Sequence, residues 1–144
     1  MLIGESTCSI YSGGWFAIPP EFREQLAAGA TVTRGIERCL LVYPADGWKQ
    51  LATKMEHQLP LTSARARAFK RLFFSGASAY VPGEPGKIRL SESLREYAGI
   101  KESMVIVGVF SHLEIWSPDR WQKTRAASSE DGVALARELA EFGI

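Results

Sequence analysis

Two seven-residue stretches decide how this chain is built. Ile18-Pro19-Pro20-Glu21-Phe22-Arg23-Glu24 is matched 72 positions later by Leu90-Ser91-Glu92-Ser93-Leu94-Arg95-Glu96, and the same offset aligns Gly14 with Gly86. After one residue of slippage, an offset of 73 aligns Gly35 with Gly108, Tyr43 with Trp116, Asp46 with Asp119 and Trp48 with Trp121. Ordered matches at a nearly constant offset indicate an internal repeat, so we predict two half-chains of similar plan.

Each half predicts the same succession of elements. A short strand, 15–18 or 87–90, follows a glycine-containing turn. A helix then begins at Pro19 or Ser91, with its Arg-Glu pair facing solvent. Two strands and a second helix follow, and the second helix has an Asp near its amino end, where the helix dipole favours an anion. The ranges predicted for these later elements are strands 31–33, 39–43, 104–109 and 112–116, and helices 46–57 and 118–142.

The halves are joined by a segment that predicts a further helix. Thr62 or Ser63 can cap residues 64–74, which hold four cations and four large apolar side chains, and Gly76 ends the helix. The favoured interpretation is an amphipathic connector with solvated cations. The alternative is a helix that faces phosphate or another subunit.

Composition limits the class of protein. Of 144 residues, 46% are hydrophobic and 10% aromatic, which is enough apolar surface to order the chain. No apolar run reaches the roughly 18–20 residues of a membrane span, and residues 1–6 lack the pattern of a secretory signal, so we expect a cytoplasmic protein with no membrane partner. Cys8 and Cys39 have no cysteine at zinc-ligand spacing; we expect buried thiols rather than a disulfide, no metal and no cofactor.

Charge is distributed unevenly between the halves. Residues 1–72 carry nine basic and six acidic side chains, a net of +3, whereas residues 73–144 carry eight and ten, a net of −2. This is far from the strong basicity of a protein that holds nucleic acid by charge alone. Binding to DNA would therefore need a local patch or many copies of a weak site.

Neither half is expected to be stable alone, because about 70 residues barely supply a core and short strands leave edges exposed. Two interlocked halves that pair strands across a pseudo-two-fold axis solve both problems. The fold class predicted is therefore α+β.

Several collinear stretches carry a resemblance to a known family. They include Ile18-Pro19-Pro20-Glu21-Phe22-Arg23, Val32-Thr33-Arg34-Gly35, Cys39-Leu40-Leu41-Val42-Tyr43-Pro44, Phe73-Phe74-Ser75-Gly76-Ala77 and Leu94-Arg95-Glu96-Tyr97-Ala98-Gly99-Ile100. At these residues the chain resembles the MraZ family of bacterial transcriptional regulators, whose halves each look like an AbrB/SpoVT swapped-hairpin unit.

The resemblance implies a double-split β-barrel made of two βαββ halves. The first half would span 5–47, connecting helices 48–75, the second half 76–119, and a C-terminal helix 120–144. It also implies a ring-shaped homo-oligomer that is nucleoid-associated and binds double-stranded promoter DNA. The DNA would be repeated elements upstream of a cell-division and cell-wall gene cluster, and no small-molecule substrate is expected.

In that family an Asp-x-x-x-Arg motif in each half reads DNA, because the arginine fork can bond O6 and N7 of guanine. Here the two positions fall on Tyr11 and Trp15 in the first half and on Gly83 and Lys87 in the second. Trp15 is uncharged and cannot form the fork, whereas Lys87 keeps the charge without the bidentate geometry.

We therefore predict a weakened site. Arg89 lies two positions after Lys87, on the same strand face, and is expected to contact DNA with it. The backbone around Gly13 and Gly14 is expected to give weaker help, and Trp15 is expected to stack on a base or bind a partner if exposed, or to fill the barrel if buried. The alternative function is a ring-forming protein-interaction module that has lost DNA binding.

An enzyme is not predicted. No pair of carboxylates lies in an apolar context suited to acid–base chemistry. His57 is expected on a surface helix and His112 at a hairpin tip, and residues 83–87 are expected to form a turn, since they lack the spacing of a phosphate loop. Trp48, Trp116 and Trp121 are expected to pack in the core.

Overall fold

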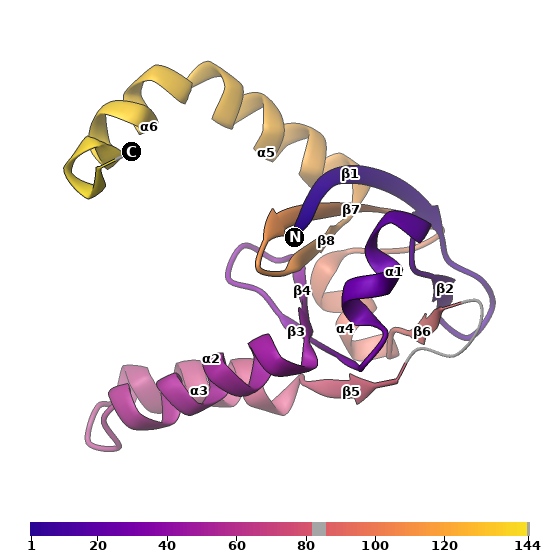
Figure 1. The fold of residues 1–144 in the computed structure, drawn as a ribbon, viewed down its shortest axis with the longest axis horizontal. Coiled ribbons are helices and arrows are strands. Elements are labelled where there is room, and N and C mark those ends of the chain that lie inside the picture. Colours follow the sequence, from indigo (N-terminus) through magenta and orange to yellow (C-terminus); the bar gives the residue numbers. More distant parts are fainter. Residues whose placement is uncertain (82–85, 144) are drawn as a thin grey trace.

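The fold is mixed α+β in this computed structural model, which describes residues 1–81 and 86–143. A six-stranded antiparallel sheet with strand order β1-β7-β8-β4-β3-β5 accompanies a two-stranded ribbon of β2 and β6 (Figure 1). The strands are β1 Leu2–Ser9, β2 Trp15–Ala17, β3 Ala30–Arg34, β4 Leu40–Pro44, β5 Ser78–Tyr80, β6 Lys87–Arg89, β7 Ser103–Phe110 and β8 Leu113–Trp116. The helices are α1 Pro20–Leu26, α2 Ala45–Gln58, α3 Ala64–Ser75, α4 Glu92–Ala98, α5 Pro118–Glu130, α6 Gly132–Glu138 and the 3-10 helix η1 Leu139–Phe142.

The sheet has the same strand order when it is read from either edge. Under the repeat, β1 corresponds to β5, β3 to β7 and β4 to β8, so the order maps onto itself with the two-fold between β4 and β8. The pairs β1–β7, β4–β8, β3–β5 and β2–β6 each join a strand of one half to a strand of the other. The predicted internal repeat is confirmed, and the halves are interlocked rather than side by side.

The core repeats in the same way. Helices α1 and α4 lie between the large sheet and the ribbon (Figure 1). Side chains at equivalent positions are almost fully buried together: Phe16 and Ile88, Ile18 and Leu90, Phe22 and Leu94, Leu26 and Ala98. Burying one large apolar side chain contributes about 1.5–3 kcal/mol, so this shared core ties the stability of one half to the presence of the other.

The short helices begin where the sequence predicts. Pro20 occupies the first turn of α1 after Pro19, and the Ser91 hydroxyl accepts a hydrogen bond from the Leu94 amide at the start of α4. Gly99 ends α4 in the left-handed conformation, with φ +67°.

The two arginines of these helices were wrongly expected to face solvent. Arg23 Nε donates to the carbonyl of Ile18 at 2.8 Å, and Arg95 Nε donates to the carbonyl of Leu90 at 3.2 Å. Each carbonyl lies just beyond the last residue of its strand, where the guanidinium satisfies it in place of a neighbouring strand.

Two strands and one helix break differ from the sequence prediction. Strands β1 and β5 were not predicted, so each half is ββαββ rather than βαββ. Both are edge strands, and they depend on pairing with β7 and β3 more than on their own composition. The single helix predicted at 118–142 is interrupted at Asp131, directly before Gly132, a residue type of low helix propensity.

Helices α2 and α3 form a hairpin that projects from the sheet (Figure 1). The Ser63 hydroxyl accepts from the Ala66 amide at 3.1 Å and caps α3, while Gly76 follows its last residue. Trp48 of α2 stacks on Phe73 of α3 with ring centroids 5.2 Å apart. Of the tryptophans expected in the core, Trp116 is buried there and Trp121 packs against it, whereas Trp48 is half-buried in this hairpin, outside the core.

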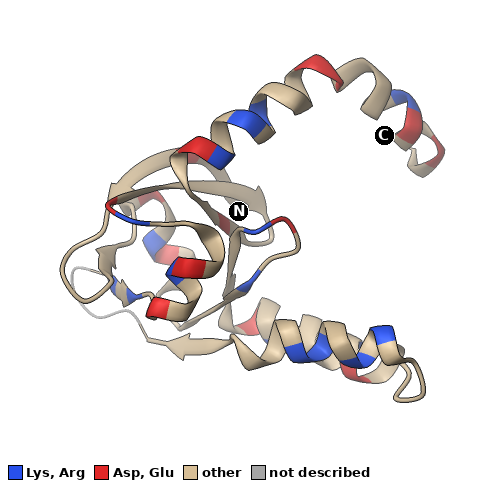
Figure 2. Ribbon diagram, turned by 180° about the vertical axis from the view of Figure 1, so that it is seen from behind, with Lys and Arg blue, Asp and Glu red and all other residues tan. Residues whose placement is uncertain are grey.

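Basic residues mark the outer part of this hairpin (Figure 2). Lys70 Nζ lies 2.7 Å from Glu56 Oε2, and Arg67 Nη1 donates to the Leu61 carbonyl at 2.7 Å. Arg65 and Arg71 are exposed. Two of the four cations therefore brace the hairpin itself, and only Arg65 and Arg71 are solvated as the connector interpretation expects.

Both cysteines are free thiols. Cys39 is buried beside Trp116 and Val105, and burial raises the pKa of its thiol to about 12. Burial also raises the pKa of Cys8. Raised pKa values keep both thiols protonated and unreactive at neutral pH.

The hairpin turns of the two halves pack on the opposite half. In the β7–β8 turn, His112 stacks on Tyr43 of β4 with ring centroids 4.5 Å apart. In the β3–β4 turn, the Arg38 carbonyl accepts from Arg120 Nη1 at 3.0 Å and the Gly35 carbonyl accepts from the Tyr97 hydroxyl. His112 does lie at a hairpin tip, as predicted, and it fixes that tip to the first half.

This contact predicts a pH-dependent stability. Burial lowers the pKa of His112 below its usual 6.5, and the nearby Glu114 carboxylate only partly opposes this effect. The unfolded chain therefore binds the proton more readily than the folded one, so the free energy of unfolding falls as the pH drops below about 6.5. Thermal unfolding between pH 7.5 and 5 measures this; His112→Phe, which keeps an aromatic ring on Tyr43, should show a flatter profile.

The matched control is His57→Gln on the exposed face of α2, which should retain the wild-type profile. An unchanged slope in His112→Phe would show that His112 does not cause the acid sensitivity.

Candidate nucleic-acid interface

The β2–β6 ribbon forms an exposed face whose residues come from both halves. Phe16 pairs with Ile88 at its centre, and both side chains point into the core. Side chains alternate between the two faces of a strand, so the flanking residues point outward. These flanking pairs are Trp15 with Arg89 and Ala17 with Lys87.

Two reciprocal hydrogen bonds hold the ribbon at its ends. The Ile18 amide donates to the Gly86 carbonyl at 3.0 Å, and the Leu90 amide donates to the Gly14 carbonyl at 2.8 Å. The repeat exchanges these two bonds, since Ile18 corresponds to Leu90 and Gly14 to Gly86. Each half thus supplies the carbonyl that accepts the hydrogen bond at the end of the other half's strand.

Gly14 is buried behind the exposed face and fixes the position of the residues on it. Its φ is +88°, and a Cβ there would lie 2.2 Å from the Leu90 carbonyl oxygen and 3.0 Å from Arg95 Nε, so only glycine fits. Its amide donates to the Tyr11 carbonyl at 3.0 Å, and its own carbonyl accepts from Leu90. With both backbone groups engaged and the residue buried, Gly14 positions its neighbours and has no backbone group left for a ligand.

Gly13 lies on the exposed side and organises two of the other predicted site residues. Its carbonyl accepts from Arg89 Nε at 2.7 Å. Trp15 Cδ1 lies against it, since a Cβ at Gly13 would meet that atom at 3.5 Å. Within residues 1–81 and 86–143, the terminal nitrogens of Arg89 make no hydrogen bond, so the arginine is anchored through Nε with its fork unengaged.

An open hollow of about 400 Å³ lies beside these residues, lined by Tyr11, Ser12, Trp15 and Lys87. Tyr11 is 63% exposed and Trp15 43% exposed. The Tyr11 amide donates to the Trp15 carbonyl at 2.8 Å, so the two aromatic residues flank one tight turn. Trp15 is therefore exposed rather than part of the core.

The structure brings four of the five predicted site residues to one face: Gly13, Trp15, Lys87 and Arg89. Gly14 lies behind them. Tyr11 was singled out in the sequence only as the place of a lost aspartate; its four-residue spacing from Trp15 across two glycines was the available signal. Of the turn predicted over 83–87, residues 83–85 lie outside the described part of the chain.

The face combines cations and aromatic rings on one small, rigid surface. Lys87 and Arg89 can attract phosphate or bond guanine, and the aromatic rings offer apolar contact or stacking. A two-stranded ribbon fits the major groove of DNA, which is about 12 Å wide. The arrangement suits an anionic, planar-ringed ligand such as nucleic acid.

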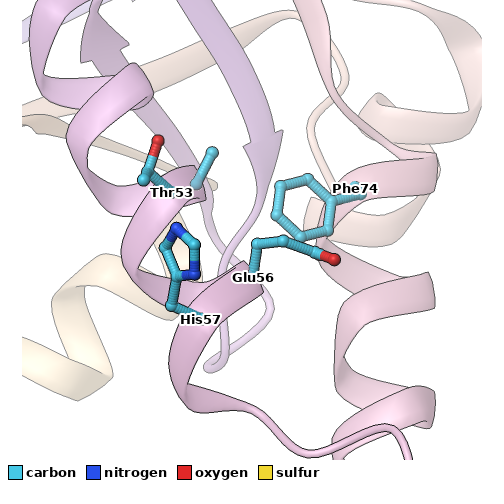
Figure 3. A pocket seen from close by; sticks show the side chains of 5 residues that line it. Thr53, Glu56, His57 and Phe74 are labelled. Carbon is cyan, nitrogen blue, oxygen red and sulfur yellow. The ribbon is translucent and has the colours of Figure 1, made fainter.

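A second hollow, about 490 Å³, lies on the α2–α3 hairpin. Figure 3 shows Thr53, Glu56 and His57 of α2 beside Phe74 of α3. His57 is exposed on a helix, as predicted. The Glu56 carboxylate is already paired with Lys70, and the lining contains no lysine or arginine.

Neither a metal cluster nor a membrane span is found in the described residues. No three His, Cys, Asp or Glu side chains of 1–81 and 86–143 gather closely enough to hold a metal ion. Over the same residues, no helix has the length and apolar character needed to cross a bilayer.

The two-fold repeat and the shared ribbon define a class of protein in which one chain forms a pseudo-dimer. Comparison with known proteins identifies the family within this class. The model of the family described as "MraZ protein, putative antitoxin-like" matches residues 1–72 and again 73–140, one match for each half. The chain belongs to the MraZ family.

Full-length relatives agree. A protein of Moorella thermoacetica is 41% identical over 144 residues, and one of Natranaerobius thermophilus is 39% identical over 144 residues; both alignments cover all of each chain. A third, from Thermomicrobium roseum, is 39% identical over 140 residues, 97% of this chain and 98% of its own. Each carries the name "Transcriptional regulator MraZ", which is the name of a regulator and not of an enzyme.

Proposed function

We propose that this protein is a DNA-binding transcriptional regulator that contacts promoter DNA through the outer face of the β2–β6 ribbon. The names of its relatives support the regulatory role. The observation that carries the proposal is the ribbon register, which turns Lys87 and Arg89 outward together on one exposed face. The targets are repeated promoter elements of a cell-division and cell-wall gene cluster, as the family resemblance implies.

Each residue has a distinct role in this proposal. Arg89, anchored through Nε on the Gly13 carbonyl, presents its terminal nitrogens to O6 and N7 of a guanine. Lys87 contributes a point charge to a base or a phosphate. Trp15 cannot supply the bidentate contact that an arginine would, and one such contact discriminates by about 1–3 kcal/mol, so base reading is weaker than in a ribbon with two arginines.

We also propose that the sheet and ribbon together form a double-split β-barrel. The strand order that repeats from either edge supports this. In this description the first AbrB/SpoVT-like half spans 5–47, the connecting helices 48–75, the second half 76–119 and the C-terminal helical arm 120–144. The protein acts in the cytoplasm, associated with the nucleoid.

A ring-shaped homo-oligomer completes the proposal. The last part of this arm, α6 and η1, extends away from the sheet (Figure 1), and four of its large apolar side chains are exposed: Val133, Leu135, Leu139 and Phe142. Exposed apolar side chains that gather on one segment mark a contact with another chain. Several ribbons on one ring would recover affinity through effective concentration even where each contact is weak.

DNA binding is tested with promoter fragments that contain the short direct repeats upstream of the gene, by fluorescence anisotropy at several salt concentrations. We expect wild-type binding that weakens as salt rises, and a loss of about tenfold or more in Lys87→Ala/Arg89→Ala. The salt slope of that variant should also become shallower, because fewer counterions are released.

Lys54→Ala, which removes an exposed cation from α2 far along the hairpin, is the matched control and should bind as wild type does. Equal losses in both variants would show that the ribbon is not the interface. No binding by the wild-type protein at any salt would favour the alternative, an interaction module that has lost DNA binding.

The role of the arm is tested by analytical ultracentrifugation. Leu139→Asp/Phe142→Asp places charges on the exposed apolar surface of η1, and we expect the sedimentation coefficient to fall to that of a smaller species because the apolar contact between chains is lost. Ser128→Asp/Ser129→Asp adds the same charge to the exposed surface of α5 and should leave the assembly intact. Equal sedimentation of all three proteins would exclude the arm as the contact.

A further inference from the structure

The two strands of the ribbon present different chemistry. Strand β6 turns Lys87 and Arg89 outward, whereas β2 turns Trp15 and Ala17 outward and carries no ionisable side chain. Because the repeat relates Trp15 to Lys87 and Ala17 to Arg89, a symmetric ribbon would show the same pair twice. This ribbon is cationic on one strand and aromatic on the other.

We infer that the ribbon reads an asymmetric DNA site: the half under β6 through guanine, and the half under β2 through apolar contact of Trp15 and Tyr11 with thymine methyl groups. This inference rests on the proposed binding of duplex DNA. It assigns to Trp15 and Tyr11 a positive role in base choice, in place of the lost arginine contact.

The hollow beside Trp15 has the chemistry for this contact. It is lined by Tyr11, Ser12, Trp15 and Lys87, so two of its four lining residues are aromatic. The thymine C5-methyl is the only apolar group that an unmodified base pair presents in the major groove, and protein side chains recognise it by apolar contact. Lys87 also lines this hollow, so a cation that can contact a phosphate lies beside the aromatic residues that contact the methyl group.

The aromatic pair is held in place before DNA arrives. The Tyr11–Trp15 turn is closed by the Tyr11 amide on the Trp15 carbonyl at 2.8 Å and by the Gly14 amide on the Tyr11 carbonyl at 3.0 Å. The Leu90 amide then fixes Gly14 to the second half at 2.8 Å. A rigid contact surface loses little conformational freedom on binding, so even a small apolar gain appears in the affinity.

The same turn links the two kinds of readout. Gly13 lies against the Trp15 ring and accepts from Arg89 Nε, so one residue sets the position of both. Trp15 and Arg89 are direct cross-strand partners. The guanine contact and the methyl contact are therefore fixed at a constant separation, which predicts one composite motif rather than two independent ones.

Selection from a pool of random duplex DNA tests the inference whatever the sequence of the operator. For the wild-type protein we expect an enriched motif with guanine in one half and thymine in the other. Trp15→Ala should lose the thymine preference and keep the guanine half, whereas Trp15→Phe should keep both. Trp15→Arg should replace the thymine preference by guanine and make the motif closer to symmetric.

The second measurement compares the affinity for DNA with and without the thymine methyl groups. In the enriched duplex, replacing thymine by deoxyuridine should weaken wild-type binding about threefold to tenfold, the effect of a buried methyl group, and should leave Trp15→Ala unaffected. Lys54→Ala should respond as wild type does. Circular dichroism of each variant confirms that it is folded.

A symmetric wild-type motif, or equal affinity for thymine and deoxyuridine duplexes, would overturn this inference while leaving the proposed function standing. Equal or tighter binding of single-stranded DNA would also overturn it, because the aromatic rings would then stack on unpaired bases. Failure of the wild-type protein to retain any duplex would overturn the proposed function and this inference together.

Discussion

The fold depends on two reciprocal hydrogen bonds at the ends of the ribbon, from Ile18 to Gly86 and from Leu90 to Gly14. A ribbon of two three-residue strands is not stable in water by itself. Here its ends are fixed by these bonds, and its inner face, Phe16 and Ile88, is buried against both halves. The glycine at position 14 is required because the Leu90 carbonyl approaches so closely that no Cβ fits.

This construction lets one chain do what a symmetric dimer cannot. In a homodimer the two strands of such a ribbon would be identical, and any change in one would appear in both. In this chain the two copies are separate stretches of sequence, so β6 keeps two cations while β2 carries a tryptophan in the equivalent place. The shared core tolerates this difference because the changes lie on the outward face and the inward positions remain apolar.

The repeat made much of the architecture predictable from the sequence. Equivalent apolar positions gave the core, and Pro19, Ser63, Ser91 and Gly76 gave the helix boundaries. Edge strands β1 and β5 were missed because short edge strands depend on their partners, which a local pattern does not contain. The helix break at Asp131 was missed although Gly132 is a local signal for it, whereas the inward hydrogen bond of Arg23 is decided by packing, which periodicity does not contain.

The interface was predictable in part. Alternation along β6 correctly placed Lys87 and Arg89 on one face. The register that sets Trp15 opposite Arg89 was not predictable, because it is fixed by strands 72 residues apart. The involvement of Gly14 in backbone hydrogen bonds also needed the structure, since its nearest contacts come from the other half.

Native-state hydrogen exchange at the Ile18 and Leu90 amides tests most directly whether the two halves depend on each other. If the reciprocal bonds hold one cooperative unit, both amides exchange only through global unfolding, with equal free energies that match the denaturant value. The Leu59 amide, at the C-terminal end of α2, should exchange far faster. Exchange of one of the two amides through a partial opening that leaves the other protected would contradict the account.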